Sequence, residues 1–361
     1  MPFESETQDI EFRAAEIRQL SSIEPTQPAP PRDAAIDFTK GMLVLFMVLY
    51  HWLNYFIGSQ GQYYSYLRFL TPSFIFISGF MISRIHLSRY GSVGRHLAKR
   101  LTVRGFKLLA MVFLLNVLIT LVPARAGGRD AVLTTSLRNI CRVFIVANPT
   151  ASEGQKSVAF SMLVPIAYLL ILAAAIVILT KRESHAFSYT LFVLIIAVTL
   201  SYAYGMVSSY LDLLMIGVLG IVIGFAETRQ IAFVLSHPYV LIVLYFCYLA
   251  AITIWKMTFP LQVVSVILTA ALLYIAGSGK APGAAWRRTV LLGKYSLLGY
   301  ISQIAILQAL RRISWLSQHG VGVLLASLLL GMLLTVLVVE AADFARRRSA
   351  LADGLYRLVF A

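Results

Sequence analysis

Long apolar stretches separated by short polar segments run through most of the sequence. A bilayer core of about 30 Å needs roughly 20 apolar residues per transmembrane helix. On that measure, about ten segments are predicted to cross a membrane as helices: 35-57, 67-87, 102-122, 159-180, 187-205, 207-226, 235-255, 259-276, 290-310 and 321-341. The pattern therefore predicts an all-α, polytopic integral membrane protein.

The composition supports this prediction. The 361 residues are 59% hydrophobic and 13% charged, whereas about 25% of the residues in a soluble domain are charged. The net charge of +15 comes from bases that cluster in the loops between apolar stretches, which is the orientation signal of a membrane protein and not a sign of nucleic-acid binding. Cys141 and Cys247 lie far apart, so neither a disulfide framework nor a metal site is predicted.

The distribution of Lys and Arg predicts the orientation of the chain. With the N-terminus inside, most bases fall in cytoplasmic loops, which places both termini in the cytoplasm of a cell with the protein in its inner (plasma) membrane. Residues 1-34 are predicted to be a disordered cytoplasmic tail, 35-341 a transmembrane domain and 342-361 a basic cytoplasmic C-terminal segment. An outward segment, 123-158, is predicted to contain a short interfacial helix at 138-146.

The first predicted span carries two ionisable residues on one face. At 100° per residue, the 11 steps from Lys40 to His51 return to within roughly 20° of the same direction and cover about 16 Å. Asp37 lies one turn before Lys40 and is placed to neutralise it. An ionisable side chain inside a span is costly and is a functional candidate, and the ordinary pKa of histidine suits proton transfer. The alternative is an aromatic belt at the membrane surface, because Tyr50, Trp52 and Tyr55 flank His51.

Three short motifs occur in order along the chain. They are Asp37-Phe-Thr-Lys40-Gly41 followed by His51, then Pro72-Ser-Phe-Ile-Phe-Ile-Ser78-Gly79-Phe80, and finally Gly293-Lys294-Tyr295-Ser296-Leu297-Leu298-Gly299-Tyr300. Together they resemble the signatures of the acyltransferase family 3 membrane proteins, a family with ten helices. The resemblance implies acyl transfer from acyl-CoA.

The chain departs from the family pattern at two positions. Lys40 stands where the family has arginine, which keeps the charge but not the planar fork, and Gln303 stands where many members have a second histidine. Among subgroups, the first two motifs look most like the enzymes that succinylate periplasmic glucans. A related superfamily that N-acetylates heparan-type glucosamine shares the general layout, so the branch stays open.

A basic segment separates the second and third predicted spans. It contains no acidic residue but several bases, namely Arg84, Arg89, Arg95, Lys99, Arg100, Arg104 and Lys107, with His86 and His96. In a helix, Arg100, Arg104 and Lys107 would form one stripe that suits the phosphates of coenzyme A. The family resemblance implies the same role. The alternative is anchoring to anionic lipid headgroups.

Further polar residues fall in the outer half of the predicted spans. Asp212 is predicted to orient His51 or to pair with Arg68, whereas Asn116, Ser302 and Gln303 are predicted to support the acceptor or the transition state. The alternative for each is a hydrogen bond that joins two helices.

The resulting hypothesis is a membrane O-acyltransferase. Cytoplasmic acetyl-CoA or succinyl-CoA is the expected co-substrate, with no permanently bound cofactor. His51 is the expected general base, and a glycan or glycolipid outside the cytoplasm is the expected acceptor. The rival hypothesis is a non-catalytic transporter or flippase for a lipid-linked sugar, although the spans show no corresponding pair interrupted by Gly or Pro.

Overall fold

The computed structural model describes residues 33–58, 63–87, 94–121, 160, 162–180, 183–255, 258–279, 283–313 and 320–360. All elements in these ranges are helices, which confirms the predicted all-α class. The predicted tail up to residue 32 and the segment 123–158, with its predicted interfacial helix, lie outside the described residues.

The described helices match the apolar pattern of the sequence. They are α2 (Ala34–Trp52), η1 (Leu53–Ile57), α3 (Tyr63–Leu67), α4 (Leu70–Met81), η2 (Ile82–Leu87), α6 (Gly94–Leu121), α9 (Leu163–Leu179), α10 (Glu183–Ala203), α11 (Ser209–Gly224), α12 (Thr228–Leu235), α13 (Pro238–Trp255), α14 (Phe259–Gly277), α15 (Ala284–Lys294), α16 (Ser296–Arg311), α18 (Val321–Arg348) and α19 (Ala350–Phe360). Among the described residues, six helical segments are long and apolar enough to cross a membrane, or up to eight if two bent pairs each count as one span. The number ten and the orientation of the termini stay predictions.

One predicted span is not continuous. The expectation of a single helix over 290-310 is wrong, because the chain bends by 95° between α15 and α16. Tyr295 at the bend has φ −110° and ψ 30°, outside the helical region, and its hydroxyl donates a hydrogen bond to Asp343 of α18. A similar bend of 106° separates α11 from α12. Two pairs of apolar helices are therefore bent among the described residues, and the absence of a corresponding pair of spans interrupted by Gly or Pro stays a prediction.

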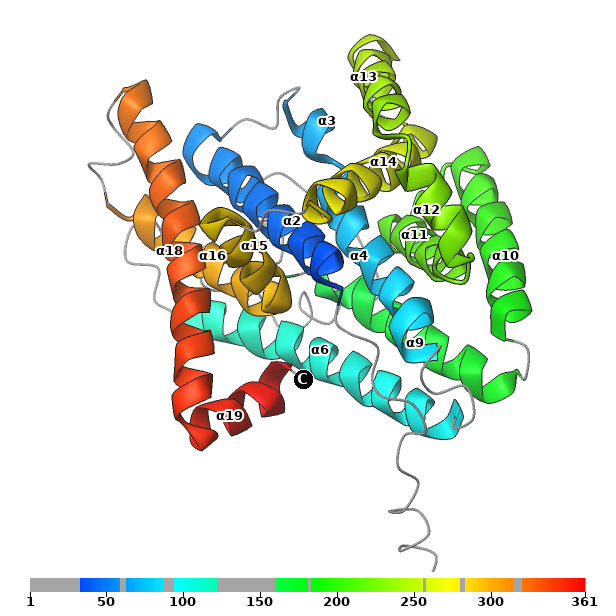
Figure 1. The fold of residues 1–361 in the computed structure, drawn as a ribbon, viewed down its shortest axis with the longest axis horizontal. Coiled ribbons are helices and arrows are strands. Elements are labelled where there is room, and N and C mark those ends of the chain that lie inside the picture. Colours follow the sequence, from blue (N-terminus) through cyan, green and yellow to red (C-terminus); the bar gives the residue numbers. More distant parts are fainter. Residues whose placement is uncertain are drawn as a thin grey trace, which may run out of the picture. The chain divides into compact units, whose positions relative to one another are not determined.

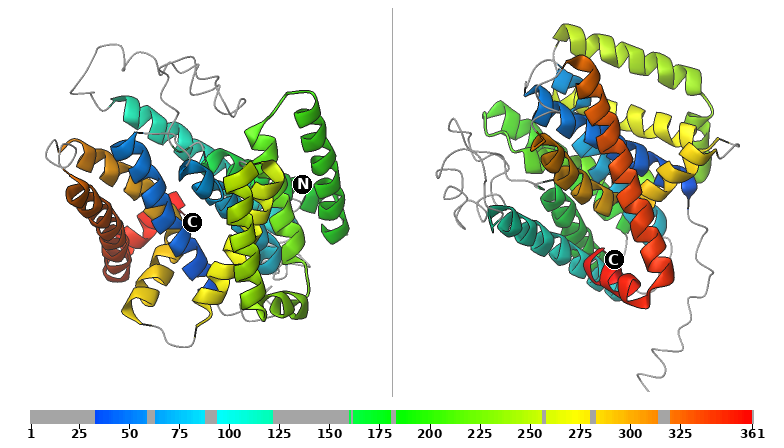
Figure 2. Two further views of the ribbon diagram at one scale, coloured as in Figure 1. Left: turned by 90° about the horizontal axis from the view of Figure 1, so that it is seen from above. Right: turned by 90° about the vertical axis from the view of Figure 1, so that its left-hand side faces the viewer.

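Helix α2 lies at the centre of the described domain. It packs against α4, α14, α15, α16 and α18, so that helices from distant parts of the sequence surround it (Figures 1 and 2). Its contact with α15 is made through glycine: a Cβ at Gly41 would overlap the carbonyl oxygen of Thr289, and a Cβ at Gly293 would overlap that of Asp37. Two predicted motifs therefore meet backbone to backbone at this crossing.

The second motif makes a similar crossing. Helix α4 packs against α11, where a Cβ at Gly79 would overlap the carbonyl oxygen of Gly217 and a Cβ at Gly220 would overlap that of Phe76. Small residues let the two backbones approach closely, which is how helices associate in a bilayer, where burial of apolar surface gives little drive.

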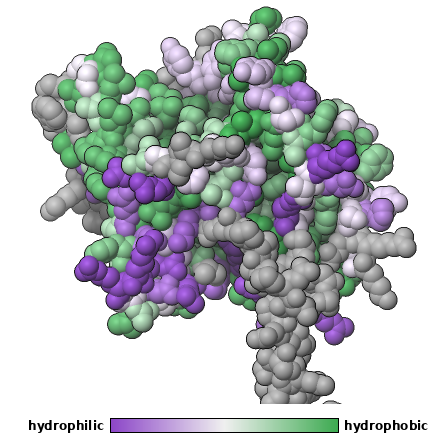
Figure 3. Space-filling view, in the orientation of Figure 1, coloured by the Kyte–Doolittle hydropathy of each residue, from purple (hydrophilic) through white to green (hydrophobic). Residues whose placement is uncertain are grey.

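Large apolar side chains also cover the outside of the peripheral helices. Examples are Phe192 (62% exposed) on α10, Phe246 (66%) on α13 and Leu329 (67%) on α18. Figure 3 shows apolar residues across much of one face and hydrophilic residues gathered at the lower left, near the end of α18. A soluble domain seldom exposes so much apolar surface, whereas lipid tails solvate it. The chain is a multi-pass membrane protein.

Candidate active site

His51 lies at the C-terminal end of α2 inside a group of tyrosine rings. The imidazole contacts Tyr50 edge to face (centroids 5.3 Å apart), stacks with Tyr55 (6.2 Å) and lies 6.4 Å from Tyr300 of α16. We call these three residues the tyrosine cage. No hydrogen bond joins the imidazole to another described residue.

The backbone changes its geometry directly after His51. Residues Leu53–Ile57 form a π-helical turn, η1, which is rare and occurs often at functional sites. The indole of Trp52 donates a hydrogen bond of 2.7 Å to Ser327 of α18, and Gln308 of α16 donates to the Tyr55 hydroxyl at 3.4 Å. These contacts fix both sides of the wide turn and hold Tyr55 over the imidazole.

Helix α16 contributes a buried polar face beside the tyrosine cage. Gln303 lies one turn after Tyr300, is completely buried, and neither its amide nitrogen nor its amide oxygen has a hydrogen-bond partner in the structure. A buried amide without partners costs about 1–3 kcal/mol. Phe160, which has an unusual φ of +65°, packs its ring edge-on against Tyr300. The surroundings of Tyr300 are thus aromatic, with one unsatisfied amide on the same helix.

Asp212 and Arg68 lie in a neighbouring polar group. The Tyr202 hydroxyl donates a hydrogen bond of 3.0 Å to Asp212, whose other carboxylate oxygen is buried without a partner. Arg68 is exposed and close enough for its charge to act on both Tyr50 and Tyr202. Among the described contacts, Asp212 reaches neither His51 nor Arg68.

The two remaining candidates bond within their own helices. The Asn116 side chain donates to the carbonyl oxygen of Val112 at 2.8 Å, and the Ser302 hydroxyl donates to that of Gly299 at 3.2 Å. Asn116 is buried, and Ser302 is half-buried. Their support of an acceptor stays a prediction.

The start of α2 has a different chemistry from its end. Lys40 forms an ion pair with Asp37 at 2.7 Å, which confirms the predicted neutralisation, and both side chains are largely buried. Gly293 of α15 packs on this turn of α2. Lys294 and Tyr295 come directly after Gly293 in the sequence. The first and third motifs therefore form one structural unit around the crossing of α2 and α15.

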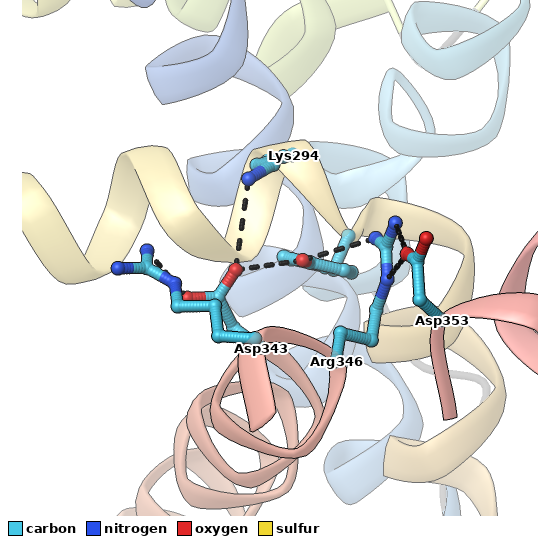
Figure 4. A network of polar contacts seen from close by, with 6 residues as sticks. Lys294, Asp343, Arg346 and Asp353 are labelled. Carbon is cyan, nitrogen blue, oxygen red and sulfur yellow. Dashed lines mark hydrogen bonds and ion pairs between the residues drawn. The ribbon is translucent and has the colours of Figure 1, made fainter. Parts of the chain in front are cut away.

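A polar network continues from Tyr295 to the C-terminal helices (Figure 4). Asp343 accepts from the Tyr295 hydroxyl at 2.7 Å and pairs with Lys294 (3.6 Å) and Arg347 (2.7 Å). Arg346 donates to the Tyr295 hydroxyl (3.0 Å) and, through Nε, to Asp353 (2.9 Å). The Arg346 guanidinium holds the pKa of the Asp353 carboxyl below its ordinary value, because it hydrogen-bonds the ionised form.

The basic segment forms the first turns of α6, so the predicted stripe of Arg100, Arg104 and Lys107 exists. Arg95, Lys99, Arg100 and Arg104 are exposed, and Lys107 is half-buried. Arg84 is used elsewhere, since its guanidinium donates to the carbonyl oxygen of Ala226 and to Thr228 between α11 and α12. Arg89 lies outside the described residues. No group of three or more His, Cys, Asp or Glu side chains suited to a metal ion occurs in the described ranges.

The model of an acyltransferase domain, acyltransferase family 3, matches residues 33–340, which is most of the chain. The chain belongs to acyltransferase family 3. No curated protein and no solved structure is significantly similar to it. The family supports acyltransferase activity in a membrane and confirms the resemblance carried by the three motifs.

Within this acyltransferase domain, the structure adds residues that the sequence did not single out. Tyr50 and Tyr55 were predicted only as part of an aromatic belt, and Tyr300 only as a motif position. Their rings surround His51. Tyr300 could be found from the sequence as the last residue of the third motif. Its contact with His51 could not, because the spacing of residues along the chain does not show that this motif packs against the end of α2.

Proposed function

We propose that this member of acyltransferase family 3 transfers an acetyl or succinyl group from cytoplasmic acyl-CoA to a hydroxyl of a glycan or glycolipid outside the cytoplasm. The observation that carries the proposal is the position of His51. Its imidazole lies within a tyrosine cage at the end of the central helix of an acyltransferase domain and makes no hydrogen bond to a described residue.

In the proposed reaction, a neutral His51 nitrogen accepts the proton of the acceptor hydroxyl. The oxygen attacks the thioester carbonyl, and the tetrahedral intermediate collapses with cleavage of the C–S bond. The imidazolium then returns its proton to the CoA thiolate, so that the products are an ester and free CoA. Transfer through an acyl-histidine is the alternative route and uses the same residue as nucleophile.

The tyrosine cage and Gln303 supply the surroundings that this reaction needs. The rings exclude water from the thioester, and the amide of Gln303 is a hydrogen-bond donor for the carbonyl oxygen as negative charge develops on it. Gln303 has no partner in the structure, so this bond would satisfy a buried group. In this scheme Asp212 is held by Tyr202 and acts, with Arg68, on the acceptor side of the cage.

The donor is proposed to bind along α6. Arg100 and Arg104 offer planar guanidinium groups for the phosphates of coenzyme A, and Arg95, Lys99 and Lys107 add positive charge. Lys40 lies about 16 Å along α2 from His51 and marks the path from the basic helix to the cage. This path suits the length of a pantetheine arm.

One set of measurements tests the proposal. The purified protein should bind or hydrolyse acetyl-CoA or succinyl-CoA, and His51→Ala should retain binding but lower transfer by about 10²–10⁴-fold. Arg100→Ala with Arg104→Ala should weaken acyl-CoA binding by about tenfold or more, because each arginine to phosphate bond contributes about 1.5–3 kcal/mol.

Matched controls are available for both variants. His185→Ala removes an exposed histidine of α10, and Arg311→Ala with Arg312→Ala removes two exposed arginines at the end of α16. Neither should change activity. The proposal fails if the wild type binds neither thioester and His51→Ala leaves surface glycan acylation unchanged. Proton-coupled sugar transport that does not depend on CoA would instead support the transporter hypothesis.

A further inference from the structure

Helix α19 presents an unpartnered apolar stripe. Leu351 (82% exposed), Leu355 (65%) and Leu358 (68%) are spaced i, i+4 and i+7, so the three side chains lie on one face. Val359 at the edge of this face is 43% exposed. An amphipathic helix with this pattern buries its apolar face against something.

The opposite face of α19 is tied to the acyltransferase domain. Tyr356 contacts Tyr295 edge to face (5.2 Å), and the Arg346 guanidinium lies 4.0 Å from the centroid of the Tyr356 ring. Asp353 accepts from Arg346 and pairs with Arg357 at 2.7 Å. These contacts fix the rotation of the helix, so the leucine stripe faces away from the domain.

The position of α19 in the chain indicates what covers its leucine stripe. It follows α18 directly, a candidate membrane span that ends in Arg346, Arg347 and Arg348. Basic residues at the end of a span mark the boundary between membrane and water. Figure 1 shows that α19 runs across the end of α18 instead of continuing it, and Figure 3 shows hydrophilic residues gathered in this region. The helix therefore begins at the membrane surface.

The charges beside the stripe point to the same partner. From residue 341 to 361 the chain contains the bases Arg346, Arg347, Arg348 and Arg357 and the acids Asp343 and Asp353, an excess of two positive charges. The side chains of Arg347 and Arg357 are 73% and 69% exposed. Bases near an anionic leaflet are attracted to its negative surface. A second copy of the chain fits less well, because an 11-residue helix is only about 16 Å long and offers too little area for a stable interface.

We propose that α19 is an interfacial helix whose leucine stripe, Leu351, Leu355 and Leu358, lies in the headgroup region of a bilayer leaflet that contains anionic lipid. The domain side of the same helix holds the Tyr295 bend through Arg346. The inference does not depend on the acyltransferase reaction, because it rests on the exposed leucines, the tied opposite face and the end of the α18 span.

The test uses the full chain in nanodiscs of phosphatidylcholine with about a quarter phosphatidylglycerol. Cys141→Ser and Cys247→Ser provide a background in which Leu355→Cys or Leu358→Cys carries an environment-sensitive fluorophore. Ala350→Cys is the matched control, since it is exposed on the same helix and lies about 80° around the helix from Leu358 and about 140° from Leu355. Lipids spin-labelled near the top of the acyl chain should quench the two stripe positions about twofold or more relative to Ala350→Cys.

Two results would overturn the proposal. The first is equal quenching at the stripe and control positions, with equal access to a water-soluble quencher, which would mean that the stripe faces water. The second is quenching at the stripe that depends on protein concentration and not on the lipid label, which would assign the stripe to a second copy. Exposed single substitutions should leave folding intact, and the two stripe positions report independently.

Discussion

The two ends of α2 differ in how their polar groups are satisfied. At the start, Asp37 and Lys40 pair at 2.7 Å and the backbone touches α15 at Gly41 and Gly293. At the end, the His51 imidazole lies among tyrosine rings, and the buried amide of Gln303 on the neighbouring helix has no hydrogen-bond partner. A helix fixed at one end by paired charges and close backbones can carry unsatisfied groups at the other. The comparison separates a structural end from a reactive end.

The largest effect is expected at the backbone crossing. Gly293→Ala would place a Cβ onto the carbonyl oxygen of Asp37, and overpacking costs typically about 1–3 kcal/mol and occasionally more; a clash against a backbone atom, which cannot rotate away, should cost more than about 3 kcal/mol. Thermal unfolding in detergent should show the loss. Gly283→Ala is the control, because a Cβ there meets nothing within 4 Å. Equal stability of the two variants would contradict a close crossing.

The next effect concerns the ion pair at the start of α2. Asp37→Asn removes the negative partner of a buried ammonium group and should cost about 3 kcal/mol. Asp37→Asn with Lys40→Met removes both charges and should recover part of that stability, while activity stays low if Lys40 binds acyl-CoA. A double mutant as unstable as the sum of the two single mutants would show that the two charges are not coupled.

At the other end of α2, activity and stability should separate. Gln303→Leu removes a buried amide without partners and should leave stability unchanged or raise it by about 1 kcal/mol. Transfer should fall by about 10²-fold if the amide stabilises the thioester oxygen. Thr335→Val is the control: this residue is equally buried, but its hydroxyl already bonds to the carbonyl oxygen of Gly331. Full activity of Gln303→Leu would show that the amide does not take part in acyl transfer.

The smallest effect is a pH dependence of α19. The pKa of Asp353 is lower in the folded protein than in the unfolded chain. The ionised carboxylate therefore stabilises the attachment of α19 fully above the ordinary aspartate pKa of about 3.9, and this stabilisation is lost as the pH falls through the folded-state pKa. A fluorophore at Ala350→Cys should therefore gain mobility at low pH. Asp353→Asn should show the same gain in mobility already at neutral pH. Unchanged fluorescence anisotropy in both cases would show that the contact between Asp353 and Arg346 does not hold α19 in place.

The helices were predicted from the sequence better than the bends and contacts between them. Apolar length was sufficient for α2 and α18, because a bilayer demands it. The bend at Tyr295 was missed, since it depends on a hydrogen bond to Asp343, which lies far along the chain. The same reason explains the tyrosine cage: Tyr300 reaches His51 only through the packing of α16 on α2.

The candidate site was predicted as separate polar residues and not as an arrangement. Asp212 was identified as an acid in the outer half of a predicted span, but its partner Tyr202 lies on the preceding helix, across a turn at Gly205, which has φ +70°. The Asp37 and Lys40 pair was predictable, because both residues lie on one helix at a fixed spacing. Contacts within a helix follow from periodicity, whereas contacts between helices require the fold.

The network around Tyr295 sets the limits of the folding unit. The family match ends at residue 340, yet Asp343 and Arg346, which hold the Tyr295 bend, lie beyond it on the same continuous helix. A protein shortened at the homology boundary would lose both partners of a motif that remains inside that boundary. For expression or domain exchange, the unit to move is the chain through α19, because the family match and the contacts that hold its third motif end at different residues.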